Sequence, residues 1–181
     1  MEFFRAVRLV TCIIICEMAG AIGAFFTTPQ IGGWYRTLEK PSFNPPSWIF
    51  GPVWTTIFVL MGISLFLVWD KKWVVTNEIG SQNAKTWNKW SASLLSGSWK
   101  KLNIVLIFSL QLFLNVLWSF IFFGLHNPGL AFFELIMLWV AIIFTAVNFY
   151  RVSKNAALLL VLYIVWVSFA AVLNLSIWLL N

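Results

Sequence analysis

Five polar side chains lie within otherwise apolar stretches of this 181-residue sequence. They are two acids and three amides: Glu17, Glu134, Gln111, Asn115 and Asn174. Polar groups inside a bilayer are costly, so each is a candidate functional residue. Because no Lys or Arg lies deep enough to pair with either acid, the alternative for the acids is a protonated carboxyl bonded to a neighbouring helix. The alternative for the amides is hydrogen bonding between helices.

Conventional catalytic and metal-binding patterns are missing from the sequence. It has no C-x-x-C-H haem attachment motif, P-loop, H-E-x-x-H metal motif or nucleophile elbow. Cys12 and Cys16 lie four residues apart within an apolar run, where two small apolar side chains are favoured over a disulfide or metal site. His126 could ligate a haem iron, but a solvated loop histidine is favoured. We therefore predict no metal site and no required cofactor.

Composition predicts the elements that must position these groups. The chain is 61% hydrophobic and 10% charged, far from the roughly 25% charged residues of soluble proteins. Five apolar runs, each about 20 residues or longer, could cross a bilayer as helices. They lie near 6–28, 48–69, 103–125, 129–150 and 155–180. We expect a single all-α integral membrane domain over 1–181, a bundle of five transmembrane helices. A cleaved signal peptide is disfavoured because the first run continues through Phe25 and Phe26.

The distribution of the net charge of +6 predicts orientation rather than nucleic-acid binding. Ten of the twelve Lys and Arg residues fall on one side of the predicted spans, and only Arg36 and Lys40 fall on the other. The positive-inside bias then places the N-terminus in the cytoplasm of a multi-pass protein of the cell (inner) membrane. Six of these lysines lie in a polar insertion over 70–101. There, Trp87, Trp90 and Leu94 fit a short helix in the headgroup layer, and an ordinary loop fits equally.

The segment between the first two spans reads WYRTLEKPSFNPPSWIFGPVW, from Trp34 to Trp54. Its four prolines fix backbone angles and remove donors, so the loop is stiff. An aromatic loop of this kind, lying over a bundle, favours recognition of a bulky apolar ligand. Either Ser47 is the N-cap of span two, or the helix proper begins near Pro52.

Indole and polar groups gather in the outer half of the predicted bundle, beneath this loop. Trp118 and Trp166 are too deep for the interfacial aromatic belt. Trp166 and Ala170 share a helix face, which leaves space beside an indole. The whole set is Trp54, Asn115, Trp118, Glu134, Trp166 and Ala170. We expect a pocket for a flat, apolar ligand with a few polar handles.

The chain resembles the translocator protein / tryptophan-rich sensory protein (TspO) family, once called the peripheral benzodiazepine receptor. Besides the Trp34–Trp54 segment, the matching pieces are LNVLWSFIFFG in span three and YIVWVSFAAVLN in span five. The resemblance implies a five-helix bundle, often a homodimer, with a ligand pocket closed by the first loop. It implies porphyrin, haem-related or synthetic aromatic ligands, and cholesterol in animal members. Sterol binding is doubtful here because no cation follows Tyr163.

Residue roles also follow from the resemblance. Trp54 and Trp166 match the two pocket tryptophans linked to light-dependent porphyrin breakdown in some bacterial members. The implied ligand-binding positions are Tyr35, Pro45, Trp54, Asn115, Trp118, Glu134, Trp166 and Ala170. The leading hypothesis is a membrane-embedded tetrapyrrole-binding protein that senses, sequesters or transports its ligand. The alternatives are a light- and oxygen-dependent porphyrin-degrading enzyme, and a membrane scaffold that binds lipid or a protein partner.

Overall fold

The computed structural model describes residues 2–70 and 97–181, with side chains described for 2–70 and 102–181. Within these ranges every regular element is helical, which confirms the predicted all-α class. The helices are α1 (Glu2–Ile31), α2 (Trp34–Thr37), η1 (Ser47–Ile49), α3 (Phe50–Trp69), α5 (Gly97–Ser119), η2 (Phe120–Gly124), α6 (Pro128–Tyr150), α7 (Lys154–Leu159) and α8 (Val161–Leu180).

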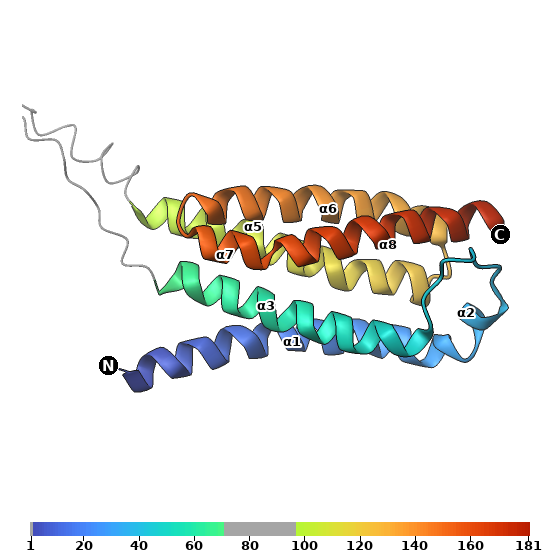
Figure 1. Cartoon of the computed structure of the whole chain (residues 1–181), viewed down its shortest axis with the longest axis horizontal. Helices are drawn as coiled ribbons and strands as arrows, with labels where there is room; N and C mark the ends of the chain where they lie inside the picture. The colour runs from blue at the N-terminus through green and yellow to red at the C-terminus, as the bar shows by residue number, and fades with distance from the viewer. Residues whose placement is uncertain (1, 71–96) are drawn as a thin grey trace, which may run out of the picture.

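Five helical segments are long and apolar enough to cross a membrane, which confirms the predicted five spans. They are Glu2–Ile31, Ser47–Trp69, Leu102–Gly124, Pro128–Tyr150 and Lys154–Leu180. Figure 1 shows these helices running alongside one another as a bundle. The proposed headgroup-layer helix at Trp87, Trp90 and Leu94 falls outside the described residues and stays a prediction.

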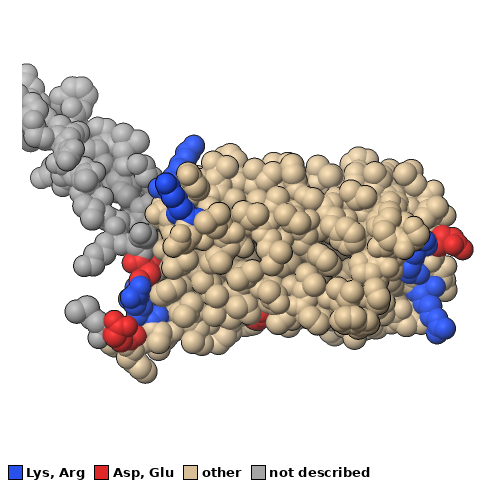
Figure 2. Space-filling model, viewed as in Figure 1, with Lys and Arg blue, Asp and Glu red and all other residues tan. Residues whose placement is uncertain are grey.

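The bundle has two distinct ends. We call one the N-terminal end, where α1 and α5 begin and α3 and α6 end. We call the other the loop end, where α2, the 38–46 segment and the C-terminus lie (Figure 1). On the face seen in Figure 2, the Lys and Arg side chains of the described residues lie at these two ends and not along the length between them. At the N-terminal end, Arg5 Nε lies 2.8 Å from Asp70 Oδ2, which links α1 to α3.

The second span does not begin as an N-cap at Ser47. Ser47 is instead the first residue of a short 3-10 turn, and it follows Pro46, which has an extended backbone (φ −55, ψ 140). Because Ser47 already lies inside the turn, its side chain makes no cap hydrogen bond. The α-helix proper starts at Phe50, so Pro52 lies in its first turn, where proline is tolerated. The prediction that the helix begins near Pro52 is confirmed, and the Ser47 alternative is wrong.

A break at Leu160 divides the last span. The Leu160 amide donates to the Ala157 carbonyl at 3.1 Å, a tight turn of the 3-10 type between α7 and α8. α7 packs on both α3 and α6, whereas α8 keeps the packing on α6 and its backbone does not approach α3 closely. The backbones of α3 and α8 are therefore separated at the loop end, where large side chains fill part of the space between them.

Candidate functional site

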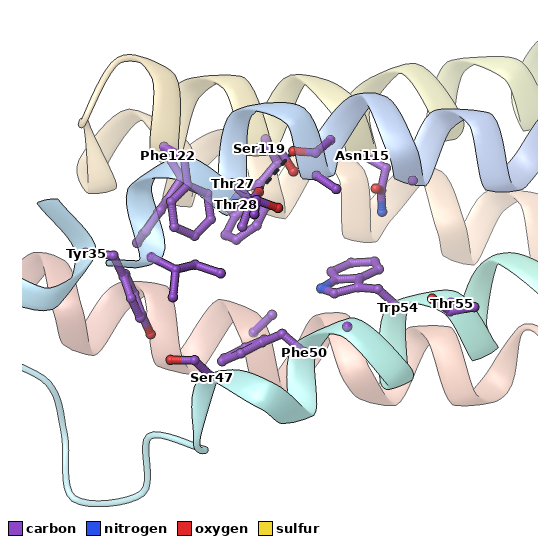
Figure 3. A pocket seen from close by; sticks show the side chains of 18 of the residues that line it. Thr27, Thr28, Tyr35, Ser47, Phe50, Trp54, Thr55, Asn115, Ser119 and Phe122 are labelled. Carbon is purple, nitrogen blue, oxygen red and sulfur yellow. Dashed lines mark hydrogen bonds between the residues drawn. The ribbon is translucent and has the colours of Figure 1, made fainter. Parts of the chain in front are cut away.

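A cavity of about 340 Å³ lies in the loop-end half of the bundle. It is enclosed by α1, α3, α5, η2 and α8, with Tyr35 and Ser47 at its loop end. Figure 3 shows Trp54 and Asn115 projecting towards this space, and Tyr35 and Ser47 near the loop. This volume lies at the lower end of the range for small-molecule pockets, and the lining is mostly apolar with a few polar groups.

Aromatic rings form the wall between α3 and α8. The Trp54 and Trp166 ring centroids are 6.4 Å apart with an interplanar angle of 88°, an edge-to-face pair. Phe50 meets Trp166 edge-on at 6.0 Å, and Phe58 lies 5.8 Å from Trp54. Phe50, Trp54 and Phe58 recur every four residues, so one face of α3 presents all three rings to the cavity. The wall offers both faces and edges of rings to an aromatic ligand.

Two amides on the cavity wall are engaged between helices. Asn115 Nδ2 donates to the Tyr163 hydroxyl at 2.8 Å. The Trp118 indole N–H donates to Asn174 Oδ1 at 3.1 Å, and Asn174 Nδ2 donates to the Pro128 carbonyl at 2.7 Å. Hydrogen bonding between helices, the alternative considered for the amides, therefore holds for Asn115 and Asn174. Both also line the cavity, so structural and binding roles coincide at these positions.

Two buried side-chain atoms of lining residues have no hydrogen-bond partner among the described residues. One is Glu17 Oε1 and the other is the Trp166 indole nitrogen, Nε1. Unpaired buried polar groups are uncommon in folded proteins. A ligand with its own donors and acceptors could pair with both of them.

Two other buried polar residues lie away from this lining. Glu134 is 4% exposed and Gln111 is 0% exposed, and neither lines the cavity. Both carboxyl oxygens of Glu134 and both amide atoms of Gln111 lack a partner in the described parts of the chain. The bond from a protonated acid to a neighbouring helix, considered for Glu134, is therefore not present in this structure.

The loop over the cavity is held at several points. The Tyr35 hydroxyl donates to Asn44 Oδ1 at 2.9 Å, and Lys40 Nζ lies 4.8 Å from the Tyr35 ring centroid. Burial raises the pKa of the Tyr35 hydroxyl, with the Asn44 hydrogen bond opposing the shift, so Tyr35 is neutral at physiological pH. The Asn181 side chain accepts from the Glu39 amide and donates to the Glu39 carbonyl, each at 3.0 Å. These contacts join segments far apart in the sequence.

His126 belongs to this bracing rather than to the cavity. Its ring stacks on Trp34 at 4.4 Å, and its Nε2 lies 3.1 Å from Gln30 Oε1. Its φ of 53 places it in the left-handed region, at the tight turn before α6. The side chain is exposed and does not line the cavity, so it is not placed to ligate a haem bound there.

Six of the eight predicted ligand-binding residues meet around one cavity, and their binding roles stay predictions. These are Tyr35, Trp54, Asn115, Trp118, Trp166 and Ala170. Pro45 lines a second depression, which shares Ile31, Tyr35 and Ser47 with the cavity, and Glu134 lies outside the cavity lining. Sequence reasoning missed the ring positions Phe50 and Phe58, although their spacing of four from Trp54 was a usable signal. It also missed the contribution of α1, whose lining residues are mostly small.

The sequence is similar to known proteins over most of its length. Residues 12–179 match the model of the TspO/MBR family. The chain is 39% identical over 180 residues to the tryptophan-rich protein TspO of Chlorobaculum tepidum, covering 98% of each chain. It is 38% identical to the tryptophan-rich protein TspO of Archaeoglobus fulgidus, covering 96% of this chain and 97% of that one. It is also 33% identical to the translocator protein of Homo sapiens, covering 89% and 85%.

Proposed function

The chain belongs to the TspO/MBR family of multi-pass membrane proteins, and on that basis we propose that it binds a tetrapyrrole and senses, sequesters or transports it. The observation that carries the proposal is the ring-walled cavity inside the bundle. A macrocycle that is flat and aromatic can stack on one indole and meet the edge of another, the geometry that Trp54 and Trp166 present.

Charge near the loop end supports a ligand with acidic groups. Arg36 and Lys40 line the second depression, which shares Ile31, Tyr35 and Ser47 with the cavity. A tetrapyrrole inserted with its ring among the indoles would direct its carboxylates towards these two cations. Arg36→Gln should therefore weaken binding of protoporphyrin IX but not of its dimethyl ester, measured by titration in nanodiscs. Equal weakening of both ligands would contradict this placement.

Orientation and assembly belong to the proposal as well. Arg5, Arg8, Arg151 and Lys154 lie at the N-terminal end. With the lysines of the insertion, this bias supports a cytoplasmic N-terminal end in the cell membrane and a loop end that faces outwards. The family resemblance also implies that the protein forms a homodimer. Labelling of Ser42→Cys from each side of sealed vesicles tests the orientation, and light scattering of the purified protein tests the dimer.

Titration with protoporphyrin IX in nanodiscs, in the dark, tests the binding function. We expect saturable binding, weakened by Trp54→Phe with Trp166→Phe. Phenylalanine keeps a smaller ring at each position, so the double variant loses part of two aromatic contacts that are worth about 0.5–1.5 kcal/mol each. Kd should therefore rise several-fold and by at most roughly 150-fold, at about 1.4 kcal/mol per tenfold change. The matched control is Trp48→Phe with Trp178→Phe, which removes two indoles outside the cavity lining. No saturable binding, or equal loss in the control, would refute the proposal.

A second function, light- and oxygen-dependent porphyrin degradation, is favoured by one observation. Trp54 and Trp166 stand 6.4 Å apart on the cavity wall, and the Trp166 N–H has no partner among the described side chains. Both indoles would lie beside an excited porphyrin that generates reactive oxygen. At saturating porphyrin under illumination, the Trp54→Phe/Trp166→Phe variant should lose the bleaching that the native protein supports. Bleaching at the native rate in the saturated variant would exclude a role for these tryptophans.

A further inference from the structure

The cavity is open on one side of the bundle. Only six of its lining residues are exposed, and all of them have small side chains: Ala21, Ala24 and Thr28 on α1, and Ser47, Gly51 and Thr55 on η1 and α3. At Gly51 an added Cβ would meet nothing within 4 Å, so the space beside it is open. The opening therefore lies between the loop-end halves of α1 and α3, on the surface that faces lipid.

Helix packing bounds this opening towards the N-terminal end. A Cβ at Gly62 of α3 would lie 2.6 Å from the Cα of Ile13 on α1, so the two backbones touch there. Nearer the loop, a Cβ added at Gly20 of α1 would lie 2.6 Å from the ring of Phe58 on α3, so this ring fills the space between the two helices there. Beyond Phe58 the two helices present only small side chains to each other at the surface. The gap thus lies on the loop side of Phe58.

The other sides of the cavity are closed by large groups. Between α3 and α8, Phe50 and Trp166 meet at 6.0 Å, and Phe169 extends this wall at 5.5 Å from Trp166. Between α1 and η2, Phe26 and Phe120 meet edge-on at 5.3 Å. A bulky ligand could pass through either wall only after several rings had moved.

The loop end is closed by polar contacts. Both hydrogen bonds between Asn181 and the Glu39 backbone would have to break for the 38–46 segment to lift, together with the bond from Tyr35 to Asn44. The stacked Trp34 and His126 rings hold the preceding turn against η2. Entry from the aqueous side therefore requires several contacts to open together, whereas the lateral gap requires none.

We propose that the ligand enters and leaves through this lateral opening between α1 and α3, directly from the bilayer. The inference rests on the proposed function and deepens it, because it restricts the ligand to molecules dissolved in the membrane. Small residues at the gap leave room for a bulky ring to pass edgewise. The hydroxyls of Thr28 and Thr55 border the path and suit a ligand with polar groups on its rim.

Blocking the gap tests the route. Ala21→Phe with Thr55→Phe places a ring on each side of the opening. The matched control is Ile22→Phe with Thr56→Phe, at the next positions, which are exposed but do not line the cavity. Binding of protoporphyrin IX to phosphatidylcholine nanodiscs is followed by stopped-flow absorption. We expect the association and dissociation rates both to fall by tenfold or more in the blocked variant, because the two rings close the path in both directions, and we expect the control to keep the native rates.

A variant at the loop end tests the competing route, in which the ligand enters beneath the 38–46 segment. Asn181→Ala frees the 38–46 segment, so entry through the loop end predicts faster exchange, whereas lateral entry predicts native rates. Native rates in the blocked variant, or faster exchange in Asn181→Ala, would overturn the proposal.

A measurement without porphyrin separates this inference from the binding proposal. Lipids brominated on their acyl chains quench nearby indoles, and the contribution of Trp54 is obtained as native minus Trp54→Phe emission. An open gap predicts that Trp54 is quenched in the native protein and protected in the blocked variant. Unquenched Trp54 emission would refute the opening itself, whatever the outcome of the porphyrin titration.

Discussion

Asn174 offers a sharp test of how the cavity wall is held together. It is 2% exposed, accepts from the Trp118 indole at 3.1 Å and donates to the Pro128 carbonyl at 2.7 Å, so it joins α8 to α5 and α6. Leucine has a similar size but can make neither bond. Asn174→Leu should therefore lower stability through lost hydrogen bonds rather than through a new cavity.

The magnitude follows from the two bonds. Hydrogen bonds between membrane helices average about 0.6 kcal/mol and reach about 1.7 kcal/mol, so losing both should lower the free energy of unfolding by about 1–3 kcal/mol. Reversible unfolding by SDS in mixed micelles, followed by circular dichroism, measures this loss. Asn148→Leu is the matched control, because the Asn148 amide donates only to the Phe144 carbonyl of its own helix. It should change stability by no more than about 0.5 kcal/mol.

A double-mutant cycle isolates the bond to the indole. In the Trp118→Phe background, which lacks the indole N–H, Asn174→Leu should cost less by about 0.6–1.7 kcal/mol. No coupling between the two substitutions would refute the assigned bond. A loss in Asn148→Leu as large as in Asn174→Leu would show that the asparagine side chain matters for a reason other than contact between helices.

Gly62→Ala should cost roughly 1–3 kcal/mol by forcing α1 and α3 apart, whereas Gly51→Ala on the same helix has open space and should be neutral or stabilising in thermal unfolding. Gln111→Leu should raise stability by about 1 kcal/mol, because it replaces a fully buried amide without a partner in the described residues; a clear loss of stability would show that the amide is paired. Tyr35 should titrate above a free tyrosine, since burial raises its pKa. The stabilisation by its neutral hydroxyl is then complete below the unfolded pKa of about 10 and is lost as the pH rises through the higher folded value. The difference between the absorbance titrations of the native protein and of Tyr35→Phe measures the pKa of Tyr35. A titration midpoint at or below the pKa of a free tyrosine would contradict the prediction.

The membrane fold could be predicted from the sequence because its signal is local. Each apolar run is long enough to span a bilayer, where the backbone must satisfy its own hydrogen bonds, so the number and type of elements follow directly. The spacing of four between Trp166 and Ala170 likewise placed both on one helix face. That face does meet the cavity, as does Trp54 on α3.

Depth in the membrane, by contrast, did not determine which buried groups meet. Glu134 lies on the loop-end half of its helix, as expected, but α6 packs behind α5 and α8, and the acid lies outside the cavity lining. Pro45 belongs to the loop over the cavity, yet it lines the second depression and not the cavity itself. Ser47 is an eligible N-cap by type, but the chain enters the helix through a 3-10 turn.

The sequence by itself therefore determined the five helical spans and the grouping of Trp54, Trp118 and Trp166 towards the loop end. Only the tertiary structure decided the rotation of each helix, the break at Leu160 that separates α8 from α3, and the open side between α1 and α3. The physical reason is that periodicity shows which residues share a helix face but not which neighbour that face meets. That choice depends on contacts such as the pair between Glu39 and Asn181, which are 142 positions apart in the chain.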